Sequence, residues 1–359
     1  MNNKKIKVLV VDDSSVAREL LTFIIDSDPQ LKVIGYANDG EAALKFLEHE
    51  TPDVITMDIF MPKLDGFETT RRIMETHPIP IIIISAGYDS SQVEKSFRAI
   101  NAGALAILPK PAGPGDPLYS IVAQEIVETI KVAHGVKLIK RRPQFASPPV
   151  YNPERSADGY IETNIVSGCS IKAIAIGASL GGPPALAAIL SELSPSFPVP
   201  IFIVQHIAVG FAQGFADWLD TMTNLNVVLA KNHEQAKPGW VYVAPETHHM
   251  EVTADNAIAY IEHNKEHLFP SVAHLFRSMA YAHGPRGVGV ILTGMGKDGA
   301  AELLLMKKQG AFTIAQDEES CVMFGMPKEA IAIGAATRVV PIQKIASLLK
   351  QLTDKEILE

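Results

Sequence analysis

Short apolar runs alternate with longer amphipathic stretches in two separate parts of the chain. Runs without internal polar residues are typical of strands buried on both faces, and apolar residues recurring every three or four positions are typical of helices. In the first part, strands are expected at residues 7–11, 32–37, 53–57 and 79–84, and helices at residues 16–25, 40–48 and 67–75. This alternation predicts a parallel sheet covered by helices on both faces.

The same alternation resumes after Ser170. Strands are expected at residues 172–179, 200–206, 288–294 and 312–316, and helices at residues 210–220, 299–310 and 342–352. Residues 118–140 have helical spacing, and the proline-rich stretch after them has no sustained period. We predict an α/β protein with two doubly wound parallel-sheet domains, a flavodoxin-like one at residues 1–135 and a Rossmann-like one at residues 169–359, joined by a linker at residues 136–168.

Charged and polar residues stand where the strands of the first part end. They are Asp12 and Asp13 after the first strand, Asp58 after the third, Ser85 after the fourth and Lys110 after a fifth. The carboxyl ends of parallel strands meet at one edge of the sheet, where ligands bind. One such aspartate alone is typical of a helix cap, but three converging carboxylates form an oxygen-rich site that suits Mg²⁺.

The second part opens with a glycine-rich turn that contains Ser179. The string Gly-Ala-Ser-Leu-Gly at residues 177–181 fits the nucleophile-elbow pattern, and Pro183 and Pro184 are tolerated in the first turn of a following helix. Backbone N–H groups in such a turn can stabilise an oxyanion. The same turn is also typical of a loop that packs a helix on a strand or binds phosphate, although the dinucleotide fingerprint is absent.

A serine nucleophile needs a base and an acid, and two strand ends supply candidates. His206 closes the strand at residues 200–206, and Asp298 lies in the loop after residues 288–294. An imidazole there can accept the serine proton, and a carboxylate can fix its tautomer. Taken singly, His206 could be a hydrogen-bonded histidine at a sheet edge and Asp298 the cap of the next helix. The order Ser, His, Asp differs from that of α/β-hydrolases, whose histidine comes last.

Composition narrows the range of partners. The formal net charge of −8 and the pI near 5.8 argue against nucleic acid. Two cysteines, Cys169 and Cys321, are too few for a disulfide framework and have no zinc spacing, which favours a reducing cytoplasm. No apolar stretch approaches the roughly 20 residues of a membrane helix, so we expect no membrane insertion.

The strand-end residues of the first part, with the contexts MDIFMPKLDG and LPKP, resemble the receiver domain of two-component response regulators over residues 4–135. The resemblance implies phosphotransfer from a histidine kinase to Asp58. It also implies that Asp12, Asp13 and Asp58 hold Mg²⁺, and that Lys110 and Ser85 contact the phosphoryl oxygens. The sequence departs from the family at Ile107, where an aromatic switch residue is usual.

The strings IGASLGGPPAL, HLFPSVAHLFRSMA, ILTGMGKDGA and AQDEESCVMFGMPKEAI resemble the CheB family of chemotaxis protein-glutamate methylesterases over residues 171–350. The resemblance implies hydrolysis of glutamyl methyl esters on chemoreceptors, and deamidation of receptor glutamines, by nucleophile Ser179, base His206 and acid Asp298, with no cofactor for the hydrolysis. Leu180 and Met295 are expected to line the oxyanion site. Leu180 replaces a usual threonine, and Ala273 replaces a usual aspartate.

Two other classes of function are consistent with part of the sequence. A DNA-binding response regulator would share the receiver, but the second part has no basic helix-turn-helix pattern. A receiver joined to a catalytically silent binding domain would share every motif, because intact motifs do not establish turnover. Labelling by a serine-directed fluorophosphonate separates an esterase from a silent domain.

Overall fold

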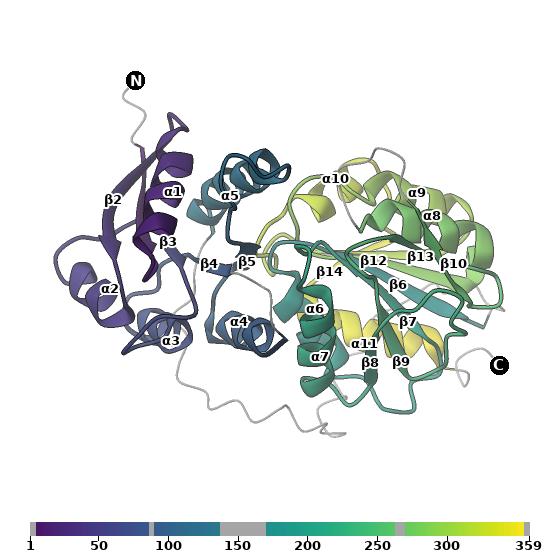
Figure 1. The fold of residues 1–359 in the computed structure, drawn as a ribbon. Coiled ribbons are helices and arrows are strands. Elements are labelled where there is room, and N and C mark those ends of the chain that lie inside the picture. The colour runs from purple at the N-terminus through teal and green to yellow at the C-terminus, as the bar shows by residue number, and fades with distance from the viewer. Residues whose placement is uncertain (1–4, 86–89, 137–169, 263–269, 355–359) are drawn as a thin grey trace. The chain divides into compact units, whose positions relative to one another are not determined.

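The computed structural model describes residues 5–85, 90–136, 170–262 and 270–354. The chain divides into two compact units, residues 1–145 and residues 146–359, and each is described by itself (Figure 1). The predicted linker at residues 136–168 lies almost entirely outside the described residues. The predicted domain boundaries therefore stay predictions.

Unit 1 is a five-stranded parallel sheet between two layers of helices. Its elements are β1 (Ile6–Val11), α1 (Ser15–Asp26), β2 (Leu31–Ala37), α2 (Gly40–Leu47), β3 (Val54–Met57), α3 (Gly66–Thr76), β4 (Ile81–Ser85), α4 (Ser90–Ala102), β5 (Ala106–Pro109) and α5 (Tyr119–His134). The strand order is β2-β1-β3-β4-β5. Helices α1 and α5 form one layer and α2, α3 and α4 the other (Figure 1). This is the flavodoxin-like arrangement that the sequence predicts.

Buried aliphatic strands and side-chain caps explain why unit 1 forms these elements. In β4 all four isoleucines are at most 1% exposed, as expected for a strand with helices on both faces. Three helices begin at a capping residue whose side chain accepts a backbone N–H of the first turn: Ser14 for α1, Asp39 for α2 and Asp65 for α3. These caps fix where each loop at the carboxyl edge of the sheet ends.

Unit 2 is a seven-stranded parallel sheet with an added hairpin. Its strands are β6 (Ala173–Ala178), β7 (Ile201–Gln205), β8 (Asn226–Leu229), β9 (Trp240–Val243), β10 (His249–Val252), β11 (Ile258–Ile261), β12 (Gly287–Ile291), β13 (Phe312–Gln316) and β14 (Arg338–Val340). Its helices are α6 (Gly182–Leu190), α7 (Ala212–Thr221), α8 (Val272–His283), η2 (Gly284–Arg286), α9 (Ala300–Lys308), α10 (Met326–Ala332) and α11 (Ile342–Thr353). The sheet order is β14-β13-β12-β6-β7-β9-β8.

The strand order of unit 2 reverses between β6 and β12, which is the switch point of a doubly wound sheet. Helices α6, α7 and α11 lie in one layer, and α8, α9 and α10 in the other (Figure 1). The Rossmann-like prediction is confirmed for the parallel sheet. The antiparallel hairpin β10–β11 was not predicted, and it packs on α8, where Ser278 Oγ accepts the N–H of Val252 at 3.0 Å.

Several element bounds differ from the sequence prediction. The helix expected at residues 118–140 is α5 over Tyr119–His134, and residues 137–140 lie outside the described part. The helix expected from residue 299 begins one residue later, because Gly299 has a positive φ of 79° and serves as its N-cap. Helix α4 was not predicted, since its mixed polar sequence gives a weak periodic pattern.

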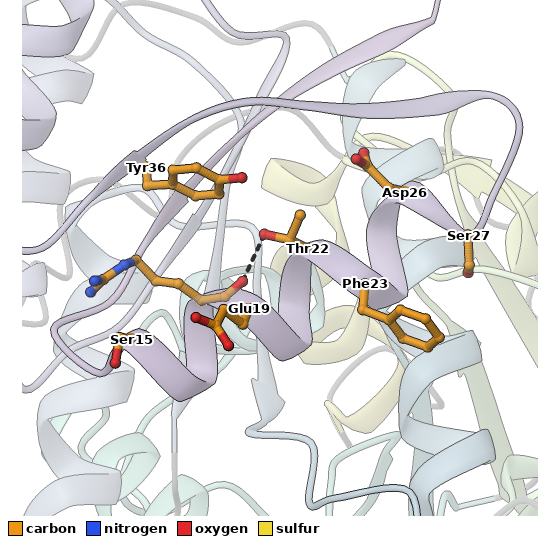
Figure 2. A pocket seen from close by; sticks show the side chains of 8 residues that line it. Ser15, Glu19, Thr22, Phe23, Asp26, Ser27 and Tyr36 are labelled. Carbon is orange, nitrogen blue, oxygen red and sulfur yellow. Dashed lines mark hydrogen bonds between the residues drawn. The ribbon is translucent and has the colours of Figure 1, made fainter.

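A groove of about 670 Å³ lies over α1 and β2 of unit 1. Figure 2 shows Ser15, Glu19 and Thr22 along α1, with Tyr36 of β2 across from them. The residues that line the groove include none of the predicted site residues. No helix in the described part of the chain is both long enough and apolar enough to cross a bilayer.

Candidate functional sites

The acidic residues predicted in unit 1 converge at the carboxyl edge of its sheet. Carboxylate oxygens of Asp12, Asp13 and Asp58 lie within 4.8 Å of one another. The Lys110 ammonium lies 2.8 Å from an oxygen of Asp12 and 2.8 Å from an oxygen of Asp58. These residues follow β1, β3 and β5, and the first two strands flank the point where the strand order of the sheet reverses. The site thus occupies the position where doubly wound sheets bind ligands.

Arg18 of α1 orients the loop that carries two of the acids. Its guanidinium donates to the backbone carbonyls of Asp12 at 2.6 Å and Asp13 at 3.1 Å. The N–H of Ser14 donates to the Asp12 carboxylate at 2.9 Å. The backbone is thereby bent so that Asp12 is buried and Asp13 remains exposed to solvent. No pattern in the sequence pointed to this use of Arg18.

Burial and crowding act on the charges in this site. Burial raises the pKa of Asp58, and the neighbouring Asp12 charge adds to the rise, against the lowering effect of Lys110. Burial alone would lower the pKa of Lys110, but its hydrogen bonds to Asp12 and Asp58 raise it. One ammonium therefore faces three carboxylates, and an excess of negative charge remains for a divalent cation to neutralise.

Ser85 ends β4 and is completely buried. Its hydroxyl has no hydrogen-bond partner among the described residues. A buried hydroxyl without a partner costs free energy, so its presence at this edge is consistent with an acceptor oxygen that binds there. Ile107, at the position of the usual aromatic switch, is half-buried on β5.

In unit 2, Ser179 lies between β6 and α6, as the elbow pattern predicts. Its N–H donates to the carbonyl of Thr293 at 3.0 Å, and its carbonyl accepts the N–H of Gly182 at 2.8 Å. Gly181 has a φ of 78°, which favours glycine. A Cβ on Gly294 would lie 2.7 Å from Ser179 Cβ, so only glycine allows this close approach. Prolines in the first turn of α6 are also as predicted.

His206 and Asp298 are joined by a hydrogen bond of 2.8 Å between Nε2 and Oδ2. His206 directly follows β7 and Asp298 lies in the loop after β12, on either side of β6. Both side chains are 13% exposed. Within the described residues, no hydrogen bond joins Ser179 Oγ to the His206 ring.

The carboxylate of Asp298 is bound by the N-terminus of α8. It accepts the Ser271 hydroxyl at 2.9 Å and the N–H groups of Val272 at 2.7 Å and Ala273 at 3.2 Å. A helix N-terminus stabilises a negative charge. The alternative that Asp298 caps the helix following it is therefore wrong, because its acceptors are used by α8 and Gly299 caps α9.

The hydrogen bonds around Asp298 outweigh the effect of its burial. Burial raises the pKa of this carboxyl, but the hydrogen bonds from His206, Ser271 and Val272 give a net lowering. Asp298 is therefore an anion at neutral pH. Ala273, the departure from the family pattern, contributes its backbone N–H, which any residue except proline would supply.

The predicted lining residues lie in two loops near Ser179. Leu180 is half-buried, and its carbonyl accepts the Thr293 hydroxyl at 2.9 Å. Met295 is 38% exposed in the loop after β12. The loop before α10 lies against the loop that carries Met295, since the N–H of Gly294 donates to the carbonyl of Met323 at 3.0 Å. Sequence reasoning assigned no role to Ser271 or Gln205, although Ser271 stood inside a quoted motif.

Comparisons with known proteins found matches for both units. The family model described as CheB methylesterase matches residues 174–349, and the response regulator receiver domain model matches residues 8–121. A protein-glutamate methylesterase/protein-glutamine glutaminase of Nitrosospira multiformis is 48% identical over 350 residues, which is 97% of each chain. One of Syntrophus aciditrophicus is 48% identical over 348 residues, covering 97% of this chain and 98% of the relative.

Among solved structures, the catalytic domain of Thermotoga maritima CheB methylesterase is 38% identical, with a TM-score of 0.49, and covers 51% of this chain and 99% of its own. The response regulator domain of Thermotoga maritima CheB is 39% identical, with a TM-score of 0.34, and covers 38% of this chain and 100% of its own. From the identity and coverage of the relatives and from the two matching family models, this chain belongs to the receiver-containing CheB methylesterase family.

Proposed function

We propose that unit 2 hydrolyses glutamyl methyl esters of chemoreceptor proteins to glutamate and methanol, and deamidates receptor glutamines, with Ser179 as the nucleophile. The observation that carries this proposal is the hydrogen bond between His206 and Asp298 at the strand ends on either side of Ser179. The names of the relatives carry both activities.

The proton transfers follow from the atoms that are bonded. His206 donates Nε2–H to the Asp298 carboxylate, so Nδ1 is the unprotonated nitrogen that can accept the Ser179 proton. Ser179 Oγ attacks the ester carbonyl, and the imidazolium then gives its proton to the departing methoxide, which leaves as methanol. The same imidazole then takes a proton from water, which attacks the acyl carbonyl, and the imidazolium returns that proton to Ser179 Oγ as the glutamate side chain leaves.

The oxyanion of each tetrahedral intermediate needs N–H donors that the protein does not already use. The N–H groups of Ser179, Thr293 and Gly294 donate to Thr293 O, Gln316 Oε1 and Met323 O. Those of Leu180 and of the Met295–Gly296 segment make no such bond among the described residues. They are the donors that we assign to the oxyanion, each worth roughly 3 to 4 kcal/mol.

Unit 1 regulates this activity through phosphorylation of Asp58 by a histidine kinase. Asp12, Asp13 and Asp58 would hold Mg²⁺, which when bound neutralises the negative charge of the site. The cluster of three carboxylate oxygens and the unpartnered Ser85 hydroxyl fit an ion with a phosphoryl group beside it. Lys110 is within reach of Asp58 and would pair with the phosphoryl oxygens. The cytoplasm is the compartment where kinase and receptor tails are accessible.

Methanol release from methylated receptor membranes tests the proposal, with and without a phosphodonor. The full chain should release methanol, and the Ser179→Ala variant should not. A fluorophosphonate should label the full chain and fail to label that variant. Absence of both methanol release and labelling would favour the catalytically silent binding domain instead.

A further inference from the structure

Gln205 is buried between the two chain segments that carry the nucleophile and the base. It is the last residue of β7 and is 4% exposed. Its side-chain Nε2 donates to the backbone carbonyl of Ser179 at 2.8 Å and to that of His206 at 2.9 Å. One amide group therefore contacts both residues on which the proposed chemistry depends.

The Gln205 contacts lie just beyond the last backbone hydrogen bond between β6 and β7, where strand pairing no longer holds the two segments together. Strands β6 and β7 are paired up to Ala178 and Gln205, and the last backbone bond between them runs from His206 N–H to the Ala178 carbonyl at 3.0 Å. Beyond this bond, the chain after β6 turns into α6 and the chain after β7 enters a loop. The Gln205 amide continues the cross-strand bonding for one more residue on each side.

The chemistry of the amide limits what can replace it. Both partners are carbonyl oxygens, so a group with two N–H donors, such as a primary amide, is needed to satisfy them together. The Gln205 Oε1 has no hydrogen-bond partner among the described residues and lies beside Gly182, where a Cβ would approach it to 2.0 Å. Glycine at residue 182 thus provides the space that the amide occupies. Neither a carboxylate nor a thioether at residue 205 could donate both hydrogen bonds.

We propose that Gln205 is a positioning residue that fixes the separation of Ser179 and His206. The proposal rests on the proposed catalytic roles of these two residues. Without the amide, the Ser179 carbonyl keeps its bond from Gly182, but the His206 carbonyl loses the donor that it has among the described contacts. The base is then free to shift relative to the nucleophile. Because Gln205 is buried, we expect its loss to act on the chemical step rather than on substrate binding.

Steady-state methanol release by Gln205→Met and Gln205→Glu tests this role in the full chain. Both variants should lower kcat roughly 10²-fold, the loss typical of a misplacement of about 1 Å, with KM within about twofold of the parent. A protonated carboxyl can donate one bond, so the rate ratio of Gln205→Glu to Gln205→Met should rise as the pH falls. A kcat within twofold of the parent, a change in KM alone, or a ratio independent of pH would overturn the proposal.

Thr313→Val is a matched control for the loss of a buried hydrogen bond. Thr313 is completely buried near the start of β13, and its hydroxyl donates to the Ala335 carbonyl at 2.7 Å. This variant should lose stability without losing kcat; an equal fall in its kcat would assign the effect of Gln205 to stability. Ser179→Ala separates the two proposals, because its continued activity would refute the nucleophile whatever the Gln205 variants do.

Discussion

Asp58 of unit 1 is a buried carboxylate and Asp298 of unit 2 a largely buried one, and both lie in a parallel sheet with the same kind of reversal in strand order. Each follows a strand beside the point where the strand order of its sheet reverses. Their pKa values nevertheless move in opposite directions, since that of Asp58 is raised and that of Asp298 is lowered. Position in the fold therefore does not decide how a strand-end carboxylate behaves.

The groups around the two carboxylates explain the difference. Asp298 accepts bonds from an imidazole, a hydroxyl and the N-terminus of α8. Asp58 faces one ammonium that it shares with Asp12, so that burial and repulsion dominate. The first arrangement keeps a charge fixed as the partner of a histidine. The second leaves charge uncompensated, as a site that binds a cation and a phosphoryl group requires.

The largest effects on methanol release are expected for Ser179 and for the hydrogen-bonded pair of His206 and Asp298. Ser179→Ala or His206→Ala should lower methanol release by up to about 10⁶-fold, because the nucleophile and base act as a unit. Asp298→Asn should cost on the order of 10⁴-fold, because an amide can stabilise the wrong tautomer of His206. Initial rates of methanol release measure each effect. More than a tenth of the parent activity in Ser179→Ala would exclude its role as nucleophile.

The same Asp→Asn substitution should change stability in opposite directions in the two units. Asp298→Asn places an amide donor against the donors of α8 and should lower the free energy of unfolding of unit 2 by about 1–3 kcal/mol. Asp58→Asn removes repulsion from Asp12 and should raise that of unit 1 by about 1 kcal/mol. Denaturant unfolding, followed by a probe in each unit, measures both. A loss of stability in both variants would contradict the comparison.

The sequence predicts the residues at the strand ends of both sites, but not the residues that position them through contacts with other segments. Buried strands appear in the sequence as apolar runs. The residues that end these runs could therefore be predicted to gather at one edge of their own sheet, as for Asp58 in unit 1 and His206 in unit 2. Gln205 and Ser271 act through backbone carbonyls and helix termini of other segments, which no local pattern reveals. The hairpin β10–β11 was missed because its strands are only four residues long and partly polar.

Mg²⁺ should distinguish the two units by ligand binding. At ten times its dissociation constant, a cation that binds only the folded state adds about 1.4 kcal/mol to the free energy of unfolding. Unit 1 should gain this stability and lose it with EDTA, whereas unit 2 should be unaffected. Thermal unfolding with each addition is the measurement, and Asp13→Asn, which removes an exposed ligand, should weaken the response. Chelator-sensitive methanol release without phosphodonor would contradict the assignment of Mg²⁺ to unit 1 alone.

The smallest effect is expected for His283, a buried titratable group that has, in the described part of the chain, neither the hydrogen bonds that surround Asp298 nor the ion pair that Asp58 makes. It is 3% exposed at the end of α8, and neither ring nitrogen has a hydrogen-bond partner among the described residues. Burial lowers its pKa, and the positive charges of Arg286 and Lys172 add to the effect. The folded protein therefore binds the His283 proton less readily than the unfolded chain does, so this group makes unit 2 less stable as the pH falls below the unfolded pKa of about 6.5.

Between pH 8 and pH 6, His283 should cost unit 2 about 0.8 kcal/mol of unfolding free energy if its folded form stays neutral. His283→Leu should remove this dependence, since leucine does not titrate. His233→Asn is the matched control, because His233 is exposed in the same unit and asparagine tolerates its positive φ of 63°. Denaturant unfolding at the two pH values should show a smaller difference for His283→Leu than for the parent or the control. An unchanged difference would mean that the buried ring is already compensated, as Asp298 is.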